Sequence, residues 1–125
     1  MVKSNLSTII VAIVLVVGMI FESIYIKNQF SELSDSFSVL YQKVEKEIAE
    51  EDDVLAVQKK WINKKSHLHI FIPHGEIKEI DLWLSEAVTL VRDKEWKDAI
   101  SKIEVLKELA EQIPSSFYLK LGNIL

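Results

Sequence analysis

The sequence predicts an all-α protein, in which an N-terminal transmembrane helix is followed by a four-helix, up-down bundle and a short extended C-terminal tail. Residues 6–26 contain thirteen Leu, Ile, Val or Phe residues and a single charge, Glu22. Four later segments repeat apolar residues at three- and four-residue spacing, which is the helical period. Before the tail, no segment alternates between apolar and polar residues for long enough to indicate a strand.

The apolar segment is long enough to cross a bilayer. Residues 6–26 would span about 30 Å as a helix, which matches the hydrocarbon core of a membrane. A cleaved signal peptide would require a shorter apolar core and a small-x-small cleavage site, but no Ala-x-Ala pattern follows Gly18. We therefore predict an uncleaved anchor over residues 1–26 and a helical domain over residues 27–125.

The orientation of this anchor is predicted from the few positive charges that flank the apolar segment. The amino terminus and Lys3 precede the apolar segment, and Lys27 follows it. Positive charges accumulate on the cytoplasmic side of membrane helices. We expect a single-pass protein of the cell membrane, with the amino terminus in the cytoplasm and the helical domain outside the cytoplasm.

The helical domain divides into four segments, taken here in chain order. The first, about 27–49, is expected to continue the membrane helix, because Ile26, Phe30, Leu33, Phe37, Leu40 and Val44 follow the helical period without a break. The second, about 54–71, follows this period with one break at Lys64. The third and fourth are expected at about 76–92 and 95–113. Phe30, Phe37, Trp61, Trp83 and Trp96 are interpreted as core residues rather than as a ligand cage.

The connections between these segments contain helix-ending and helix-starting residues. The acidic run Glu50–Asp53 suits the positive N-terminal end of the second helix. Pro73 separates the second helix from the third, and Pro114 is expected to end the fourth and to begin a tail over 114–125. Such short connections favour antiparallel neighbours in a bundle. A long rod of the first two helices, with the last two docked along it, is the alternative.

Composition argues against several classes of function. Residues 27–125 carry 14 basic and 18 acidic side chains, a net charge that argues against nucleic-acid binding. The chain has no Cys, no Gly-x-Ser-x-Gly motif and no glycine loop for a nucleotide. We therefore predict no catalytic residue, no cofactor and no enzymatic activity.

Three histidines are candidate metal ligands. His67, His69 and His74 lie near the second connection, with acidic residues shortly after them. Two histidines at two-residue spacing do not share one helix face, and zinc sites normally show tighter signatures. The preferred interpretation is that these imidazoles line the connection, and a metal site remains the alternative.

Two segments are candidate interaction surfaces. Lys59, Lys60, Lys64 and Lys65 surround Trp61, and residues 54–75 contain no acidic residue. We interpret these lysines mainly as a solvated helix face whose positive charge complements the acidic first helix. Docking to an anionic lipid or polymer is the alternative. In the tail, Phe117, Leu119 and Leu121 alternate, so this strip is expected either to fold back on the bundle or to enter a groove of a partner.

The order of these features resembles a known family. An N-terminal anchor is followed by a Phe/Leu helix, a Trp in the second helix, the junction Ile72–Ile77 and an ending of Asn123–Leu125. This order resembles the small Firmicute membrane proteins of domain-of-unknown-function family four-three-six-three, although many members carry a further Trp where this chain has residues 53–55. The resemblance implies a bacterial single-pass membrane protein, and it supplies no activity or catalytic residue.

The sequence as a whole predicts a membrane-tethered helical interaction or accessory protein. Its partners would be the lipid bilayer, through residues 6–26, and a membrane protein or a second copy of the chain. A sensory bundle outside the cytoplasm that binds a metal or small molecule is the second hypothesis. A coiled-coil scaffold of the cell-division type is the third.

Overall fold

The computed structural model describes the backbone of residues 2–124 and the side chains of residues 3–115. The described residues form four helices and no strand, which confirms the predicted fold class. The helices are α1 (Val2–Glu45), α2 (Glu51–Leu68), α3 (His74–Arg92) and α4 (Trp96–Ile124).

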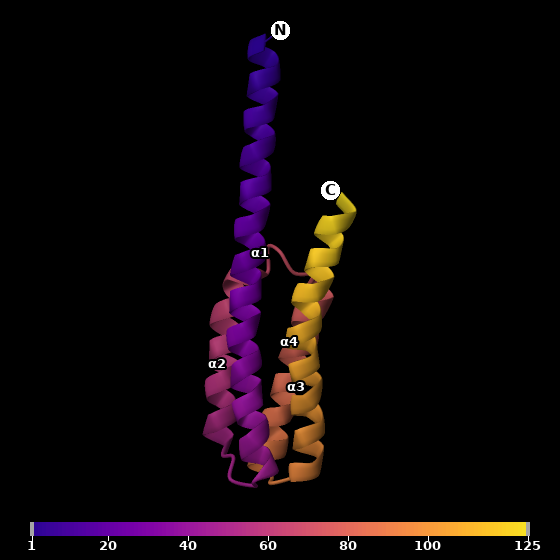
Figure 1. Ribbon diagram of the computed structural model, residues 1–125. Helices are drawn as coiled ribbons and strands as arrows, with labels where there is room; N and C mark the ends of the chain where they lie inside the picture. Colours follow the sequence, from indigo (N-terminus) through magenta and orange to yellow (C-terminus); the bar gives the residue numbers. More distant parts are fainter. Residues whose placement is uncertain (1, 125) are drawn as a thin grey trace.

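The four helices form one bundle with up-down topology (Figure 1). Helix α1 packs against α2 and α4, and α3 packs against the same two helices, so that the chain neighbours are also neighbours in space. The first hairpin therefore shares a core with the second, in contrast to the alternative of a long rod. Because α1 and α3 run one way and α2 and α4 the other, the α2–α3 connection and the end of α4 lie toward the N-terminal half of α1.

Helix α1 has two halves with different surroundings. Its first half projects beyond the other helices (Figure 1), and its large aliphatic and aromatic side chains from Leu6 to Tyr25 are exposed, with Met19 partly buried. Its second half is buried from Ile26 onward on the predicted stripe, where Ile26, Phe30, Leu33, Phe37, Leu40 and Val44 are each at most 2% exposed. No break separates the halves, as the sequence predicts.

The helix boundaries on both sides of the first connection differ from the prediction because capping interactions set them. Helix α1 ends at Glu45 rather than near residue 49, since Glu47 adopts a left-handed φ of 59°. The N–H groups of Ile48 and Ala49 then donate to the carbonyl of Lys43 at 2.9 and 3.2 Å. Helix α2 begins three residues earlier than predicted, at Glu51, where the carboxylate of Asp53 accepts from the N–H of Glu50 at 2.8 Å.

The second connection is a short hydrogen-bonded turn. The N–H groups of Phe71 and Ile72 donate to the carbonyl of Leu68 at 2.9 and 3.1 Å, so α2 ends three residues before the predicted position. Pro73 precedes α3, where its missing N–H costs no helical hydrogen bond.

The predicted extended tail is wrong, because α4 continues through Pro114 to Ile124. Proline removes one helical hydrogen bond, but Pro114 and the preceding Ile113 are both buried, so packing on the bundle holds this turn in place. Phe117 and Leu121 also continue the helical spacing from Ile113, which the alternation of residues 117–121 obscured. The side chains of Phe117, Leu119 and Leu121 lie outside the described residues, as does their predicted contact with the bundle.

The core consists of two clusters stacked along the bundle axis. The cluster nearer the first half of α1 contains Trp61, which is fully buried, with its ring centroid 6.5 Å from that of Phe30. The other cluster is built of smaller residues around Val44, Val54 and Ala99. The prediction that the aromatic residues serve the core is confirmed for Phe30, Phe37 and Trp61, while Trp83 and Trp96 are partly buried against it.

Candidate functional site

The structure separates the four predicted surface lysines. Lys60 and Lys64 point from α2 toward α1, whereas Lys65 points toward α3 and pairs with Asp81 at 3.1 Å. Lys59 is exposed. The basic cluster is therefore not one continuous patch, and half of it belongs to a network between the first two helices.

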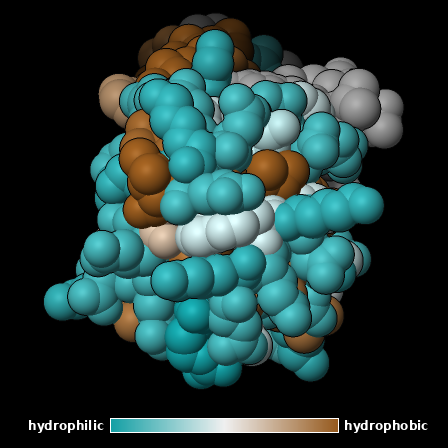
Figure 2. All heavy atoms as spheres, turned by 90° about the horizontal axis from the view of Figure 1, so that it is seen from below, coloured by the Kyte–Doolittle hydropathy of each residue, from teal (hydrophilic) through white to brown (hydrophobic). Residues whose placement is uncertain are grey.

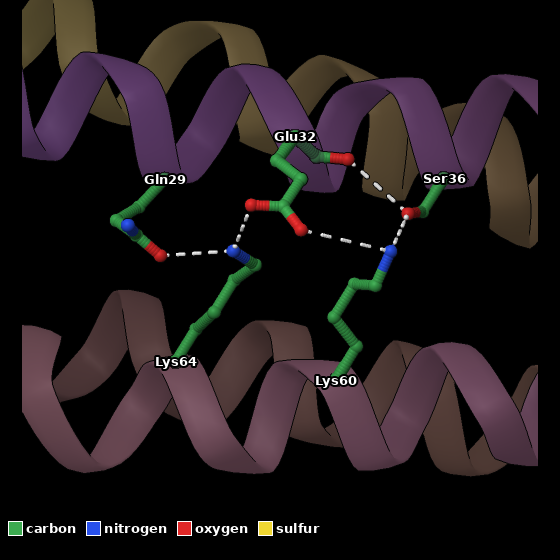
Figure 3. A network of polar contacts seen from close by, with 5 residues as sticks. All are labelled: Gln29, Glu32, Ser36, Lys60 and Lys64. Atoms are coloured by element: carbon green, nitrogen blue, oxygen red, sulfur yellow. Dashed lines mark hydrogen bonds and ion pairs between the residues drawn. The ribbon is translucent and has the colours of Figure 1, made fainter.

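That network crosses from α2 to α1 around Glu32 (Figure 3). The ammonium of Lys64 donates to Gln29 Oε1 and to Glu32 Oε2, both at 2.8 Å. The ammonium of Lys60 donates to Ser36 Oγ at 3.0 Å and lies 3.8 Å from Glu32 Oε1. One carboxylate thus holds two lysines from successive turns of α2, which sets the register of α2 on α1.

Lys64 is buried although it carries a charge. Its residue surface is 8% exposed, while the carboxylate of Glu32 beside it is 57% exposed. Burial of an ammonium is costly unless it is paired, and Lys64 meets this requirement through two oxygen acceptors. The hydrogen bond and the charge of Lys64 hold the pKa of Glu32 below its ordinary value.

A groove follows the network along the outer side of α1 and α2. Its volume is about 380 Å³, and its apolar floor includes Leu40, Val57 and the 55% exposed Val39. The charged rim includes Lys60 at one side and the ion pair of Lys43 with Asp53, 3.0 Å apart, at the other. Hydrogen bonds from Glu50 N–H and from Lys43 lower the pKa of Asp53. An apolar floor with a charged rim is typical of a surface that binds a peptide segment.

Replacing Glu32 with glutamine is expected to lower the Tm at neutral pH by no more than about 3 °C, because the carboxylate is largely exposed. The lowered pKa of Glu32 means that its contribution is complete above the ordinary pKa of 4.5 and is lost as the pH falls through the folded value. The Tm difference between wild type and variant should therefore shrink below that pH, as thermal unfolding followed by circular dichroism would measure.

The matched control for this variant is Asp35→Asn. Asp35 is exposed on the same helix and lines the same groove, and it forms no ion pair among residues 3–115. A Tm decrease for Asp35→Asn equal to that for Glu32→Gln would contradict a specific role of the Lys64 pair.

A second polar contact supports the core rather than the groove. The indole N–H of Trp61 donates to Asp81 Oδ1 at 2.7 Å, and Lys65 donates to both oxygens of the same carboxylate at 3.3 and 3.1 Å. The acid on α3 therefore satisfies the buried indole and also neutralises a lysine on α2. This arrangement explains why Trp61 can be fully buried without an unsatisfied donor.

The three histidines do not form a metal centre with their neighbours. His67, His69 and His74 are all exposed at the α2–α3 connection. Among residues 3–115, no group of three His, Asp or Glu side chains has the geometry to hold a metal ion. His67 instead lines a recess that it shares with residues of α1, including Phe21 and Tyr25.

One signal of the buried lysine is present in the sequence. Lys64 occupies a position where the apolar stripe of α2 predicts a core residue, between Trp61 and Leu68. A charged residue at a core position indicates a polar or oppositely charged partner on a neighbouring helix. The sequence does not identify this partner, because Gln29 and Glu32 lie more than thirty residues away.

The apolar half of α1 is the one candidate membrane span within the described residues. Only 6% of its most apolar stretch is buried, which distinguishes it from the buried core helix of a bundle. Length and composition therefore make it a candidate span, and a signal sequence near the N-terminus would have the same properties.

Comparison with known proteins identifies a family. A family model described as domain of unknown function (DUF4363) matches residues 20–124. This match covers the whole bundle and the last turns of the apolar segment. Comparisons with curated proteins and with solved structures find no match. The chain therefore belongs to the DUF4363 family, which agrees with the resemblance noted in its sequence.

Proposed function

We propose that this chain is a membrane-tethered accessory protein that binds a partner in the same membrane and has no catalytic role. The observation that carries the proposal is the unbroken helix α1, which is exposed and apolar in its first half and forms part of the bundle core in its second half. A helix shared in this way holds the bundle at a fixed position relative to the bilayer, because no flexible linker separates them.

The groove between α1 and α2 is the proposed binding surface. Val39 lies twelve residues beyond Lys27, so a helical rise of 1.5 Å places the groove about 18 Å from the end of the apolar segment. A partner segment that emerges from the same bilayer could reach this height within a few helical turns. The apolar floor would receive its apolar side chains, and the rim charges would select among partners.

The state of the charged groups supports binding rather than catalysis. In the groove, Glu32 is engaged with two lysines and Asp53 with Lys43. Both carboxyl groups have lowered pKa values, which favour the ionised form. A general acid at neutral pH requires the opposite shift.

The chain contains no cysteine, so a single introduced thiol provides a clean test. Val39→Cys would be labelled in intact cells that express the protein natively, using a membrane-impermeant reagent that joins a thiol-reactive group to a photoreactive group. Illumination is expected to link Val39→Cys to one larger membrane protein, because the thiol lies on the groove floor and outside the cytoplasm. Ser101→Cys, on an exposed face of α4, is the matched control and should give no such product.

Each other outcome contradicts a defined part of the proposal. Labelling that occurs only after the cells are permeabilised would reverse the proposed orientation. A product of twice the mass of the chain would show self-association and favour the scaffold hypothesis. Equal products from both positions, or none from either, would contradict the groove as a specific binding surface.

A further inference from the structure

The end of the bundle that faces the first half of α1 carries an apolar turn. This turn is the α2–α3 connection, residues 69–73, and it contains Ile70, Phe71 and Ile72 in succession. Ile70 is 74% exposed, more than any other large apolar residue in the described part of the chain. Phe71 is half-buried and Ile72 is buried, so the two following residues fix the turn to the core while Ile70 points away from it.

The turn lies at the height of the membrane segment. A recess of about 640 Å³ is lined by Phe21, Glu22 and Tyr25 of α1 together with Ser66, His67, Ile70 and Phe71. The three α1 residues belong to the last turns of the apolar segment 6–26. If that segment spans a bilayer, the α2–α3 turn is at the level where the hydrocarbon meets the headgroups.

The last turns of α4 reach the same height. Pro114 and Ser115 line a recess with Lys27, and α4 continues for nine residues beyond Ser115. At 1.5 Å per residue this continuation extends about 13 Å toward the N-terminal end of α1, and Figure 1 shows it passing the α2–α3 turn. Its residues, 117–124, include five apolar or aromatic residues and a single charge, Lys120. Tyrosine and lysine are common at membrane interfaces.

The opposite end of the bundle has a different surface. Figure 2 views that end directly, and its surface is mostly hydrophilic with few apolar patches. The end with the α2–α3 turn also exposes basic side chains, which include Lys27, His67 and His74. Lys60, Lys64 and Lys65 do not contribute to this surface in the same way, because they are paired with acids of α1 and α3. Apolar residues beside basic ones are the composition of a surface that lies on phospholipid headgroups.

We infer that the end of the bundle formed by the α2–α3 turn and the last turns of α4 docks on the bilayer, with Ile70 inserted at the boundary between headgroups and hydrocarbon. This inference rests on the proposed membrane anchoring. It adds that the bundle is held to the bilayer at three places, which are α1, the α2–α3 turn and the end of α4. Three contacts prevent the bundle from tilting about α1, so the α1–α2 groove faces one direction relative to the membrane.

The depth of Ile70 can be measured on the full chain in vesicles of phosphatidylcholine and phosphatidylglycerol. Single-cysteine variants Ile70→Cys, Ile48→Cys and Val14→Cys would each carry an environment-sensitive fluorophore. Ile48 is a matched control, since it is 62% exposed and lies between α1 and α2 at the hydrophilic end. Val14 lies in the middle of the apolar segment and reports on anchoring itself.

At position 70 we expect emission at shorter wavelength than at position 48, quenching by lipids with a nitroxide near the headgroup, and protection from aqueous iodide. Position 48 should show the reverse pattern, and position 14 should be quenched by lipids with a nitroxide deep in the acyl chain. Iodide quenching at 70 equal to that at 48, with 14 inside the bilayer, would overturn the inference alone. Protection at 70 from both quenchers would overturn it in favour of a protein partner. Exposure of 14 to iodide would overturn the anchoring.

Discussion

Replacing Trp61 with alanine is expected to lower the free energy of unfolding by about 3–5 kcal/mol, which is the range for removing a fully buried aromatic side chain. Trp61 is 0% exposed and is the largest residue in the core cluster nearer the first half of α1. Its loss would open a cavity against Phe30 and remove the indole N–H that donates a hydrogen bond to Asp81. Urea unfolding of the full chain in a mild detergent, followed by circular dichroism, would measure the change.

Two further variants separate the contributions of size and hydrogen bonding. Trp61→Phe keeps much of the ring but loses the hydrogen bond to Asp81, and we expect a loss of about 1–3 kcal/mol. Trp83→Ala is a control for removal of an indole at a partly buried site, where Lys102 lies 4.4 Å from the ring centroid. A loss for Trp61→Ala no greater than that for Trp83→Ala would contradict the central position of Trp61 in the core.

Introducing two arginines into the apolar half of α1 is expected to release the protein from the membrane. Arginine costs about 2.5–3.5 kcal/mol at the centre of a membrane helix, so Ile13→Arg with Val16→Arg opposes insertion by roughly 5–7 kcal/mol. Both positions are exposed and lie outside the bundle, so its folding should not change. Sedimentation of membranes, with immunodetection of the soluble and pelleted fractions, would measure the shift.

Three controls make the anchor prediction specific. The double leucine variant at residues 13 and 16 should remain in the membrane fraction, and Ile48→Arg, at an exposed position beyond residues 6–26, should remain there too. Mass spectrometry of the wild-type protein should recover the N-terminal peptide, because we expect no cleavage. Loss of that peptide would show a signal sequence, and an unchanged distribution of the arginine variant would contradict insertion of residues 6–26.

The helices were predictable because their apolar residues follow the helical period. The stripe from Ile26 to Val44 is buried along its whole length, as the spacing predicts. Helix ends were less predictable, because the left-handed conformation that often ends a helix is usually adopted by glycine or asparagine, which the connections between these helices lack. Glu47 and Lys94, the two non-glycine residues with positive φ in the described backbone, occupy connections where the sequence contains no glycine.

The end of α4 shows how a local rule gives way to packing. Pro114 predicts a helix end, because proline lacks an N–H and crowds the preceding turn. The helix continues nevertheless, since Ile113 and Pro114 are buried in the bundle and their burial outweighs the loss of one hydrogen bond. The extension of α4 past the α2–α3 turn follows from this continuation (Figure 1).

The candidate site was predictable only in part. The lysines around Trp61 could be recognised as a group, and Lys60 and Lys64 do pair with Glu32 of the first helix. The prediction of a solvated face is wrong for Lys64, which is buried. The predicted pairing with the first helix is wrong for Lys65, which pairs with Asp81 on α3. Successive residues of a helix point about 100° apart, so lysines that are adjacent in sequence face different neighbours once the bundle forms.

The sequence by itself determined that the chain contains an apolar segment of membrane-spanning length and four helices, because these properties depend on residues within a few turns of one another. Tertiary structure alone decided that Lys64 is buried against Glu32 and that the α1–α2 groove exists. It also placed the α2–α3 turn beside Phe21 and Tyr25. These features join residues from different helices, and their positions follow from how the helices pack in register.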